Sequence, residues 1–359
     1  MKTILFISNV TGGLYQFRKE LLETLAKNNK VIILASFNGR EDELRALGCE
    51  LIETVFERHG KNPLRELALL SMYKKHIREI KPDIVFTYTI KPNVYGGMAC
   101  AALKVPYVAN ITGLGPALEN PGMLQKITVP LCRYGLRKAQ KVFFQNSENQ
   151  NFMLKRKVVK GNYDLIPGSG VNLEQYQVLD YPNGDTVDFV FIARIIKEKG
   201  IDQYLDAAKY IREKYPHTRF HVCGSCGAEY EGILKELNDN GTVIYHGRIS
   251  DISGMHSVSQ CTIHPTYYPE GMSNVLLESC ACGRPIITTN RPGCREIVDD
   301  GINGFVVNQK DSQDLIEKVE KFLALSLEER RNMGLAGRAK VEKQFDRKVV
   351  IGKYLEEVK

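Results

Sequence analysis

The sequence predicts an α/β protein built from two Rossmann-like parallel-sheet domains in tandem. Short apolar runs alternate with helical stretches, which is typical of parallel strands joined by helical crossovers. This alternation occurs twice, and a stretch rich in Gly and Pro at residues 164–176 separates the two series. A chain of 359 residues is long enough for two domains of ordinary size.

The first series starts with a buried strand at residues 2–9, which a glycine loop connects to an amphipathic helix at 15–28. The helical pattern at residues 64–82 stops at Pro82, because proline has no backbone N–H for a helix hydrogen bond. The remaining elements predicted for this series are strands at 30–37, 49–56, 83–89, 105–112 and 141–146 and a helix at 64–82.

The second series starts with a strand at residues 187–194 and a helix at 200–216. Its later members are strands at 218–224, 243–247, 261–265, 284–289 and 304–307 and a helix at 311–325. Ligands of such sheets bind beyond the carboxyl ends of the strands. We therefore expect functional residues directly after strands, where two facing domains form a cleft.

Composition excludes several classes of protein. The opening residues 1–13 read as a strand and a loop, without the cleavage site of a signal peptide. No apolar run approaches the roughly 20 residues of a membrane-spanning helix. The nine cysteines are an odd number in a chain without a leader, which favours free thiols in a reducing cytoplasm.

The charge is divided unequally between the two halves. Residues 1–170 hold 25 Lys and Arg against 14 Asp and Glu, a net charge of +11, whereas the whole chain carries +7. A basic half indicates an anionic partner, such as phosphates or a membrane surface. No nucleic-acid-binding signature is present, so we expect no nucleic-acid partner.

Two cations follow the first strand of the second series. Arg194 and Lys199 flank a loop that leads into a helix. A helix start with two cations is suited to a diphosphate, because it combines fixed charge with free backbone N–H groups. Solvated surface charge at a helix start is the alternative interpretation of these residues.

Two glutamates lie in the stretch between His264 and Thr289. Glu270 precedes Gly271 in a loop, and Glu278 lies inside the apolar helix that follows. A carboxylate accepts two hydrogen bonds from a vicinal diol such as that of a ribose. The two glutamates are therefore compatible with two contacts on one elongated ligand, or with ordinary surface ion pairs.

The stretch HPTYYPEGMSNVLLESCACGRP, with the Arg194 and Lys199 pair, resembles the family-4 retaining glycosyltransferases. One departure is Ser279, where that family typically has alanine. The resemblance implies the GT-B fold, two Rossmann-like domains facing across a cleft. It also implies that the last helix, residues 345–359, returns to the first domain, so that 1–170 with 345–359 binds the acceptor and 171–344 the nucleotide sugar.

The resemblance implies a role for each matching residue. Arg194 and Lys199 would neutralise the donor diphosphate, Glu278 would hold the ribose hydroxyls and Glu270 would contact the donor sugar. The catalytic set is therefore Arg194, Lys199 and Glu270. The other residues expected to bind the donor are Gly12, Gly13, Arg248, Ile249, Gly271, Met272, Ser273, Asn274, Val275 and Glu278.

The segment at residues 107–118 departs from many family members, which carry a histidine near the reacting centre. Here Asn110, Thr112 and Gly113 take its place. The pattern resembles a subgroup that acts on lipid-linked saccharides in bacterial surface-polysaccharide or glycan assembly. We expect these residues, and a basic loop with Arg58 and His59, to face the acceptor.

Two other patterns favour ordinary structure, and a third leaves two interpretations open. The CGSC run at 223–226 lacks the second cysteine pair of a zinc site. The TGGLYQF run lacks the third glycine and the acidic residue of a dinucleotide fingerprint. The helical stretch at 123–141 mixes apolar and basic residues, which is compatible with either a core-facing helix or contact with anionic lipid.

These observations lead to one functional hypothesis. The protein is expected to be a metal-independent retaining glycosyltransferase with no cofactor. It would transfer a hexose or N-acetylhexosamine from a UDP-sugar to a polyprenyl-diphosphate-linked saccharide. We expect it in the cytoplasm, peripheral on the inner face of the plasma membrane. The alternatives are a UDP-sugar epimerase of the same fold and a non-catalytic sugar-nucleotide-binding protein.

Overall fold

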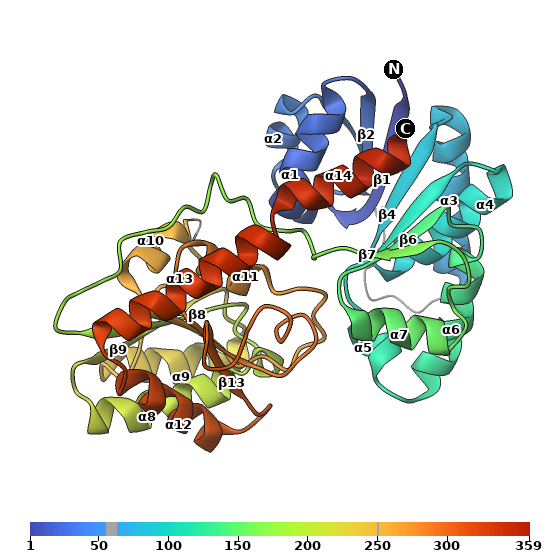
Figure 1. Cartoon of the computed structure of the whole chain (residues 1–359). Coiled ribbons are helices and arrows are strands. Elements are labelled where there is room, and N and C mark those ends of the chain that lie inside the picture. Colours follow the sequence, from blue (N-terminus) through green and yellow to red (C-terminus); the bar gives the residue numbers. More distant parts are fainter. Residues whose placement is uncertain (55–62, 250) are drawn as a thin grey trace. The chain divides into compact units, whose positions relative to one another are not determined.

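The computed structural model describes residues 1–54, 63–249 and 251–359 and divides the chain into two compact units (Figure 1). Unit 1 comprises Met1–Ser169 and Lys348–Lys359, and unit 2 comprises Gly170–Arg347. Each unit contains one sheet whose neighbouring strands all run parallel. The predicted α/β class is therefore confirmed.

The sheet of unit 1 has seven strands in the order β3-β2-β1-β4-β5-β6-β7. The order reverses between β1 (Thr3–Val10) and β4 (Ile84–Tyr88), which makes their carboxyl ends a topological switch point. The other strands are β2 (Lys30–Ser36), β3 (Cys49–Glu53), β5 (Tyr107–Ile111), β6 (Lys141–Phe144) and β7 (Tyr163–Leu165).

Helices cover both faces of this sheet, so its central strands are mainly apolar, with a few buried polar residues such as Thr87 and Asn110. On one face, α1 (Thr11–Ala26) and α14 (Arg347–Val358) bury Phe6, Phe86 and Tyr354. On the other, α3 (Pro63–Ile80) and α4 (Gly97–Leu103) cover a second cluster. The remaining helices are α2 (Glu41–Ala46), the π-helix η1 (Pro92–Gly96), α5 (Gly115–Glu119), α6 (Met123–Leu136) and α7 (Ser147–Lys155).

The sheet of unit 2 has six strands in the order β10-β9-β8-β11-β12-β13. Its switch point lies between β8 (Val187–Ile192) and β11 (Cys261–His264). The other strands are β9 (Thr218–Cys223), β10 (Ile244–Tyr245), β12 (Ile286–Thr289) and β13 (Gly304–Val307).

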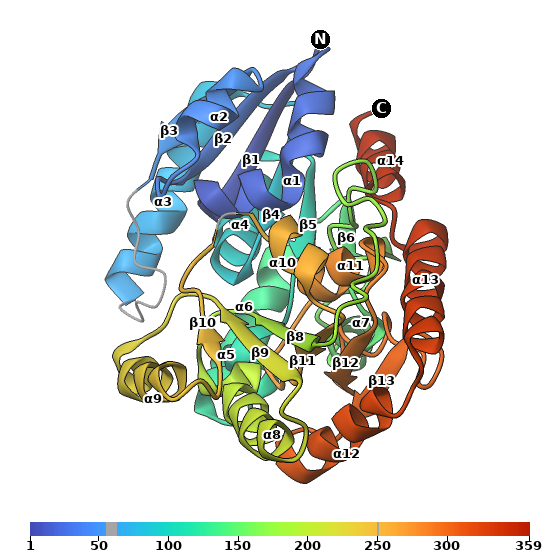
Figure 2. The ribbon, with the colours of Figure 1, turned by 90° about the vertical axis from the view of Figure 1, so that its left-hand side faces the viewer.

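The helices of unit 2 also pack on both faces of their sheet. Helices α8 (Ile201–Lys214) and α12 (Ser312–Leu323) lie side by side over the main core cluster (Figures 1 and 2). The others are the 3-10 helix η2 (Lys197–Lys199), α9 (Ala228–Asp239), α10 (Ser253–Val258), α11 (Asn274–Ala281) and α13 (Leu327–Gln344).

Several elements of the structure differ from those predicted from the sequence. The glycine loop predicted after the first strand is wrong, because α1 begins at Thr11 and contains both glycines. The strand predicted at 243–247 shortens to Ile244–Tyr245. An additional edge strand, β7, overlaps the start of the stretch that we interpreted as the interdomain connection.

Candidate functional site

Unit 2 gathers its predicted catalytic residues at the carboxyl ends of β8 and β11. Arg194 and Lys199 follow β8, whereas Glu270 follows β11. These two strands are neighbours at the point where the strand order reverses. The topology therefore places all three residues at the position where open α/β sheets bind ligands.

Gly200 allows the loops after β8 and β11 to approach closely. Its φ of 80° lies in the left-handed region, and an added Cβ would lie 2.2 Å from the carbonyl oxygen of Pro265. Only glycine fits there without displacing the backbone. Tyr267 also donates its backbone N–H to the carbonyl oxygen of Glu198 at 2.9 Å. The two loops are therefore tied together by their main chains.

The ammonium group of Lys199 forms an ion pair with the carboxylate of Glu270. The two side chains are only 13% and 16% exposed. Such a pair is screened by salt less than a surface pair. The arrangement fixes one positive and one negative group at the junction of the two loops.

Tyr268 is a site residue that the sequence reasoning did not identify. Its ring centroid lies 5.3 Å from the Arg194 guanidinium carbon and 5.0 Å from the Lys199 ammonium nitrogen. Cations within about 6 Å of a ring are attracted by its negative face. Tyr268 therefore holds both cations. The available signal was an aromatic residue two positions before Glu270.

The backbone of Gly293 packs closely against the segment that follows Glu270. That glycine has a φ of 86°, and a Cβ there would lie 2.8 Å from the carbonyl oxygen of Gly271. Its own carbonyl accepts the backbone N–H of Ser273 at 2.8 Å. Met272 is 7% exposed and packs in the core, so only its backbone can serve a ligand.

The helix α11 follows the Glu270 loop and begins at Asn274. Ser273 is its N-cap residue, although the serine side chain makes no capping hydrogen bond. Asn274 and Val275 form the first turn, where backbone N–H groups have no partner within the helix. Such a helix start can bind an anion.

Glu278 lies one turn into α11 and is only 9% exposed. Burial raises the pKa of its carboxyl to about 7, although the charge of Arg347 and a hydrogen bond from Tyr176 act in the opposite direction. The site thus contains two carboxylates in different environments. Glu270 is paired with a lysine, whereas Glu278 is largely desolvated.

Arg248 and Ile249 lie in the loop after β10. Arg248 is exposed, whereas Ile249 packs on a small apolar cluster that includes Val275 of α11. This cluster therefore links the loop to the helix start. The adjacent Ser250 lies outside the described residues.

A chain of polar side chains that the sequence reasoning missed precedes this loop. The exposed His246 lies 2.9 Å from His221 between ring nitrogens, and His221 lies 2.7 Å from the Asp188 carboxylate. Arg219 donates two hydrogen bonds to the same carboxylate. Burial raises the pKa of Asp188, but the hydrogen bonds from His221 and Arg219 outweigh burial and lower the pKa overall. The chain anchors the start of the loop in the sheet.

In unit 1, Gly12 and Gly13 lie in the first turn of α1, at the switch point beyond β1. The backbone N–H of Gly12 donates to the side-chain oxygen of Asn38 at 2.8 Å. Asn38 was not identified from the sequence. In this structure its side-chain oxygen accepts from the backbone N–H of Gly12, a residue that the resemblance assigns to binding of the sugar donor.

Of the residues predicted to face the acceptor, Asn110 lies inside unit 1. It is 1% exposed, and its amide accepts from Tyr354 and donates to the carbonyl oxygen of Thr87. Its polar atoms therefore form hydrogen bonds within the fold, and contact between Asn110 and the acceptor stays a prediction. Thr112 and Gly113 are half-buried in the loop after β5. Arg58 and His59 lie outside the described residues.

The cysteines and metal ligands give no second site. All nine cysteines are free, and eight of them are buried, including Cys223 of the CGSC run. Across residues 1–54, 63–249 and 251–359, no group of three or more His, Cys, Asp or Glu side chains is arranged to hold a metal ion.

Two protein-family models match the chain. Residues 181–340 match the model described as glycosyl transferases group 1, and residues 3–146 match the model described as glycosyl transferase 4-like. The first match contains the Arg194, Lys199, Glu270 and Glu278 positions.

Curated relatives match over most of the chain. One is the N,N'-diacetylbacillosaminyl-diphospho-undecaprenol alpha-1,3-N-acetylgalactosaminyltransferase of Campylobacter jejuni, 24% identical, with 98% of this chain and 96% of the relative covered. Another is the capsular polysaccharide biosynthesis glycosyltransferase CapM of Staphylococcus aureus, 26% identical, with 92% and 90% covered.

Among solved structures, HepE of Anabaena in complex with UDP and glucose superposes with a TM-score of 0.81 at 18% identity, covering 100% of this chain and 99% of HepE. This likeness concerns the fold. Within the described part of the chain, no helix combines the length and apolar character needed to span a bilayer. On the two family models, which account for most of both units, the chain belongs to the group 1, GT4-like glycosyltransferases and has the GT-B fold.

Proposed function

We propose that this glycosyltransferase moves a hexose or N-acetylhexosamine from a UDP-sugar to a hydroxyl of a polyprenyl-diphosphate-linked saccharide, with retention of the anomeric configuration. The observation that carries the proposal is that Arg194 and Lys199 both contact Tyr268, and Glu270 pairs with Lys199, at the switch point of unit 2. Two fixed cations beside a helix start match the charge of a nucleoside diphosphate.

Each group has a distinct role in this proposal. Arg194 and Lys199 neutralise the diphosphate, while the first turn of α11 binds a phosphate or sugar oxygen through its N–H groups. Glu278 accepts hydrogen bonds from the ribose diol, and Glu270 accepts from hydroxyls of the donor sugar. Arg248 and Ile249 border the nucleobase.

The proposed step exchanges one bond at the anomeric carbon for another. The bond from that carbon to the β-phosphate oxygen breaks, and the acceptor oxygen bonds to the carbon on the same face of the sugar. The acceptor proton passes to the departing phosphate oxygen, so no protein base is needed. Arg194 and Lys199 stabilise the charge that develops on the leaving diphosphate, without a metal ion.

The acceptor and the location are inferred from the relatives. The name of the Campylobacter jejuni relative specifies an undecaprenol-diphosphate-linked acceptor. The donor is inferred from the UDP bound to HepE. With the basic character of the first half, these inferences support a reaction in the cytoplasm, at the anionic inner face of the plasma membrane.

The test begins with isothermal calorimetry of UDP and GDP binding. It continues with a UDP-release assay on UDP-sugars, with and without a polyprenyl-diphosphate-linked saccharide. We expect UDP to bind and its release to require the acceptor. Proton NMR of the product should show the anomeric configuration of the donor. Consumption of the UDP-sugar without an acceptor would indicate the epimerase, and binding without release under any acceptor would indicate a non-catalytic protein.

A further inference from the structure

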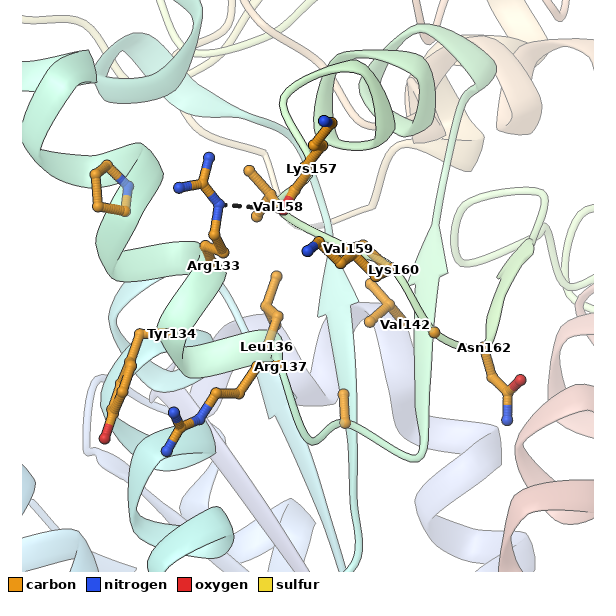
Figure 3. Close-up of a pocket in the computed structure, with 13 residues that line it drawn as sticks. Arg133, Tyr134, Leu136, Arg137, Val142, Lys157, Val158, Val159, Lys160 and Asn162 are labelled. Carbon is orange, nitrogen blue, oxygen red and sulfur yellow. Dashed lines mark hydrogen bonds between the residues drawn. The ribbon is translucent and has the colours of Figure 1, made fainter.

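Unit 1 contains a cavity of about 370 Å³ at the amino-terminal edge of its sheet (Figure 3). It is lined by the end of α6, the start of β6 and the segment at residues 157–162, which leads into β7. The glycines at the switch point lie at the opposite, carboxyl-terminal edge. Within unit 1, the cavity is therefore separate from the glycines of the proposed transfer site.

The walls of this cavity carry positive charge. Arg133, Arg137, Lys157 and Lys160 line it, and none of its lining residues is a carboxylate. The surrounding sequence has the same bias, because residues 120–162 contain nine Lys and Arg and a single acidic residue, Glu148. Such a charge distribution selects an anion.

Contacts with neighbouring groups hold the two arginines in place. Arg133 donates hydrogen bonds to the carbonyl oxygens of Lys157 and Arg156, at 3.1 and 2.8 Å. Arg137 stacks on Tyr134, with its guanidinium carbon 3.9 Å from the ring centroid, as Figure 3 shows. The first contact ties α6 to the segment before β7. The second orients a cation at the rim.

The floor of the cavity is apolar, with Leu136, Val142 and Val158 among its lining residues. A polar metabolite would gain little from this floor, whereas a molecule with a charged group and an adjoining hydrocarbon part would match both surfaces. The volume suits the head and first chain carbons of such a molecule.

An apolar stripe continues from the cavity along α6. Met123, Ile127 and Tyr134 recur at helical spacing, and their exposed fractions are 72%, 53% and 50%. Lys126 is exposed beside this stripe. Exposed apolar residues flanked by cations are typical of a helix that lies in the interface of an anionic membrane.

We propose that the cavity binds the phosphate of an anionic phospholipid, while the stripe of α6 lies in the adjoining membrane interface. Arg137 and Lys160 contact the phosphate, and the apolar floor receives the hydrocarbon next to it. This proposal concerns where the chain meets the membrane and does not depend on which sugar is transferred.

The test uses flotation of the full chain with phosphatidylcholine vesicles that contain or lack phosphatidylglycerol. The pocket variant is R137Q/K160Q, and the matched control K138Q/K155Q removes the same charge from neighbouring residues outside the cavity lining. We expect the pocket variant to partition about 30-fold more weakly into phosphatidylglycerol vesicles, because each lost lysine or arginine weakens binding about fivefold. The control variant should keep most of its binding.

Binding of soluble ligands distinguishes a site for a phospholipid from a site for free phosphate. Calorimetry should detect a short-chain phosphatidylglycerol below its micellar concentration, and inorganic phosphate should bind much more weakly. The I127S variant should lose vesicle binding while keeping the soluble lipid.

Equal losses in the two double variants, equal binding to both vesicle types, or equal affinity for inorganic phosphate would each overturn the proposal. UDP binding is measured in parallel as a check on folding. If the unaltered chain did not bind UDP, that result would count against the proposed transfer reaction but not against the lipid site.

Discussion

Lys199 and Glu270 form a largely buried ion pair although 71 positions separate them in the sequence. They meet because β8 and β11 are adjacent in the sheet and because Gly200 lets their loops touch. The pair keeps both side chains ordered before any ligand arrives. A diphosphate would therefore meet a cation that is already in position, which is the condition for electrostatic stabilisation of a transition state.

The first prediction concerns Lys199 itself. Lys199→Ala removes a cation that acts on the leaving diphosphate, so the rate of UDP release should fall by about 10²–10³. The matched control is Lys197→Ala, which removes an exposed lysine from the same 3-10 helix. Its release rate should stay within about twofold, because an exposed charge in water interacts weakly. Equal effects from the two substitutions would contradict the assignment.

The second prediction concerns Tyr268. Tyr268→Leu removes the ring between the two cations, and UDP affinity should fall by about 3- to 30-fold, as expected for the loss of cation–π contacts. Tyr268→Phe keeps the ring and should bind UDP like the unaltered chain. Tyr267→Leu serves as the control, because the cation over the Tyr267 ring is Lys310, 4.9 Å from its centroid. Calorimetry at two salt concentrations measures all three. A large loss in the Phe variant would show that the hydroxyl matters instead.

The sequence predicted the parts of this site that depend on strand order. Residues that follow β8 and β11 were expected at one edge of a parallel sheet, and the topology places them there. The class of fold followed from the same alternation of strands and helices. These features are visible in a sequence because apolar periodicity is a local property.

Contacts between distant side chains were not predictable in this way. The contacts of Tyr268 and of the Asp188–His221–His246 chain depend on the rotamers of side chains that come from different strands and loops. The burial of Asn110 depends on α14, whose Tyr354 reaches it from 244 positions away. A residue at the end of a strand can face a ligand or the core, and only packing decides between them.

The third prediction follows from the pKa of Glu278. Its carboxyl has a pKa of about 7 in the folded chain, above its ordinary value of 4.5, because the group is buried. The folded state therefore holds this proton more tightly than the unfolded state, and stability falls as the pH rises from about 4.5 to about 7. Glu278→Gln removes this loss. Above about pH 7 the free energy of unfolding of this variant should exceed that of the unaltered chain by about 2–3 kcal/mol. Near pH 4.5 the two chains should be almost equally stable. Urea unfolding at several pH values measures the difference, and a pH-independent difference would contradict it.

The fourth prediction concerns the same carboxyl in the presence of UDP. A ribose diol donates hydrogen bonds, so it favours the ionised form of Glu278, and binding should lower the pKa of that group. UDP affinity should therefore rise with pH around about 7, with proton release on binding below that value. Calorimetry in buffers of different ionisation enthalpy detects these protons. Because the phosphates of UDP also titrate, the Glu278→Gln variant provides the baseline. Identical proton release in both chains would remove Glu278 from the ribose site.

The fifth prediction tests whether Asn110 serves the fold. Tyr354→Phe deletes the hydroxyl that donates to the buried Asn110 oxygen, and leaves that acceptor without its donor. The free energy of unfolding should drop by about 1–3 kcal/mol, with a melting temperature lower by about 2–12 °C. The matched control is Tyr73→Phe. The Tyr73 hydroxyl is buried in the same unit and has no hydrogen-bond partner within the described residues. Its deletion should be neutral or slightly stabilising, because it removes a desolvated group that gains nothing from the fold.

Activity separates this role from acceptor binding. If Asn110 and Tyr354 act only through packing, the Tyr354→Phe variant should keep its KM for the acceptor and its kcat at temperatures well below its melting point. A raised KM for the acceptor at unchanged UDP affinity would instead place Asn110 in the acceptor site. The buried position of Asn110, 1% exposed beneath α14, argues for the first result.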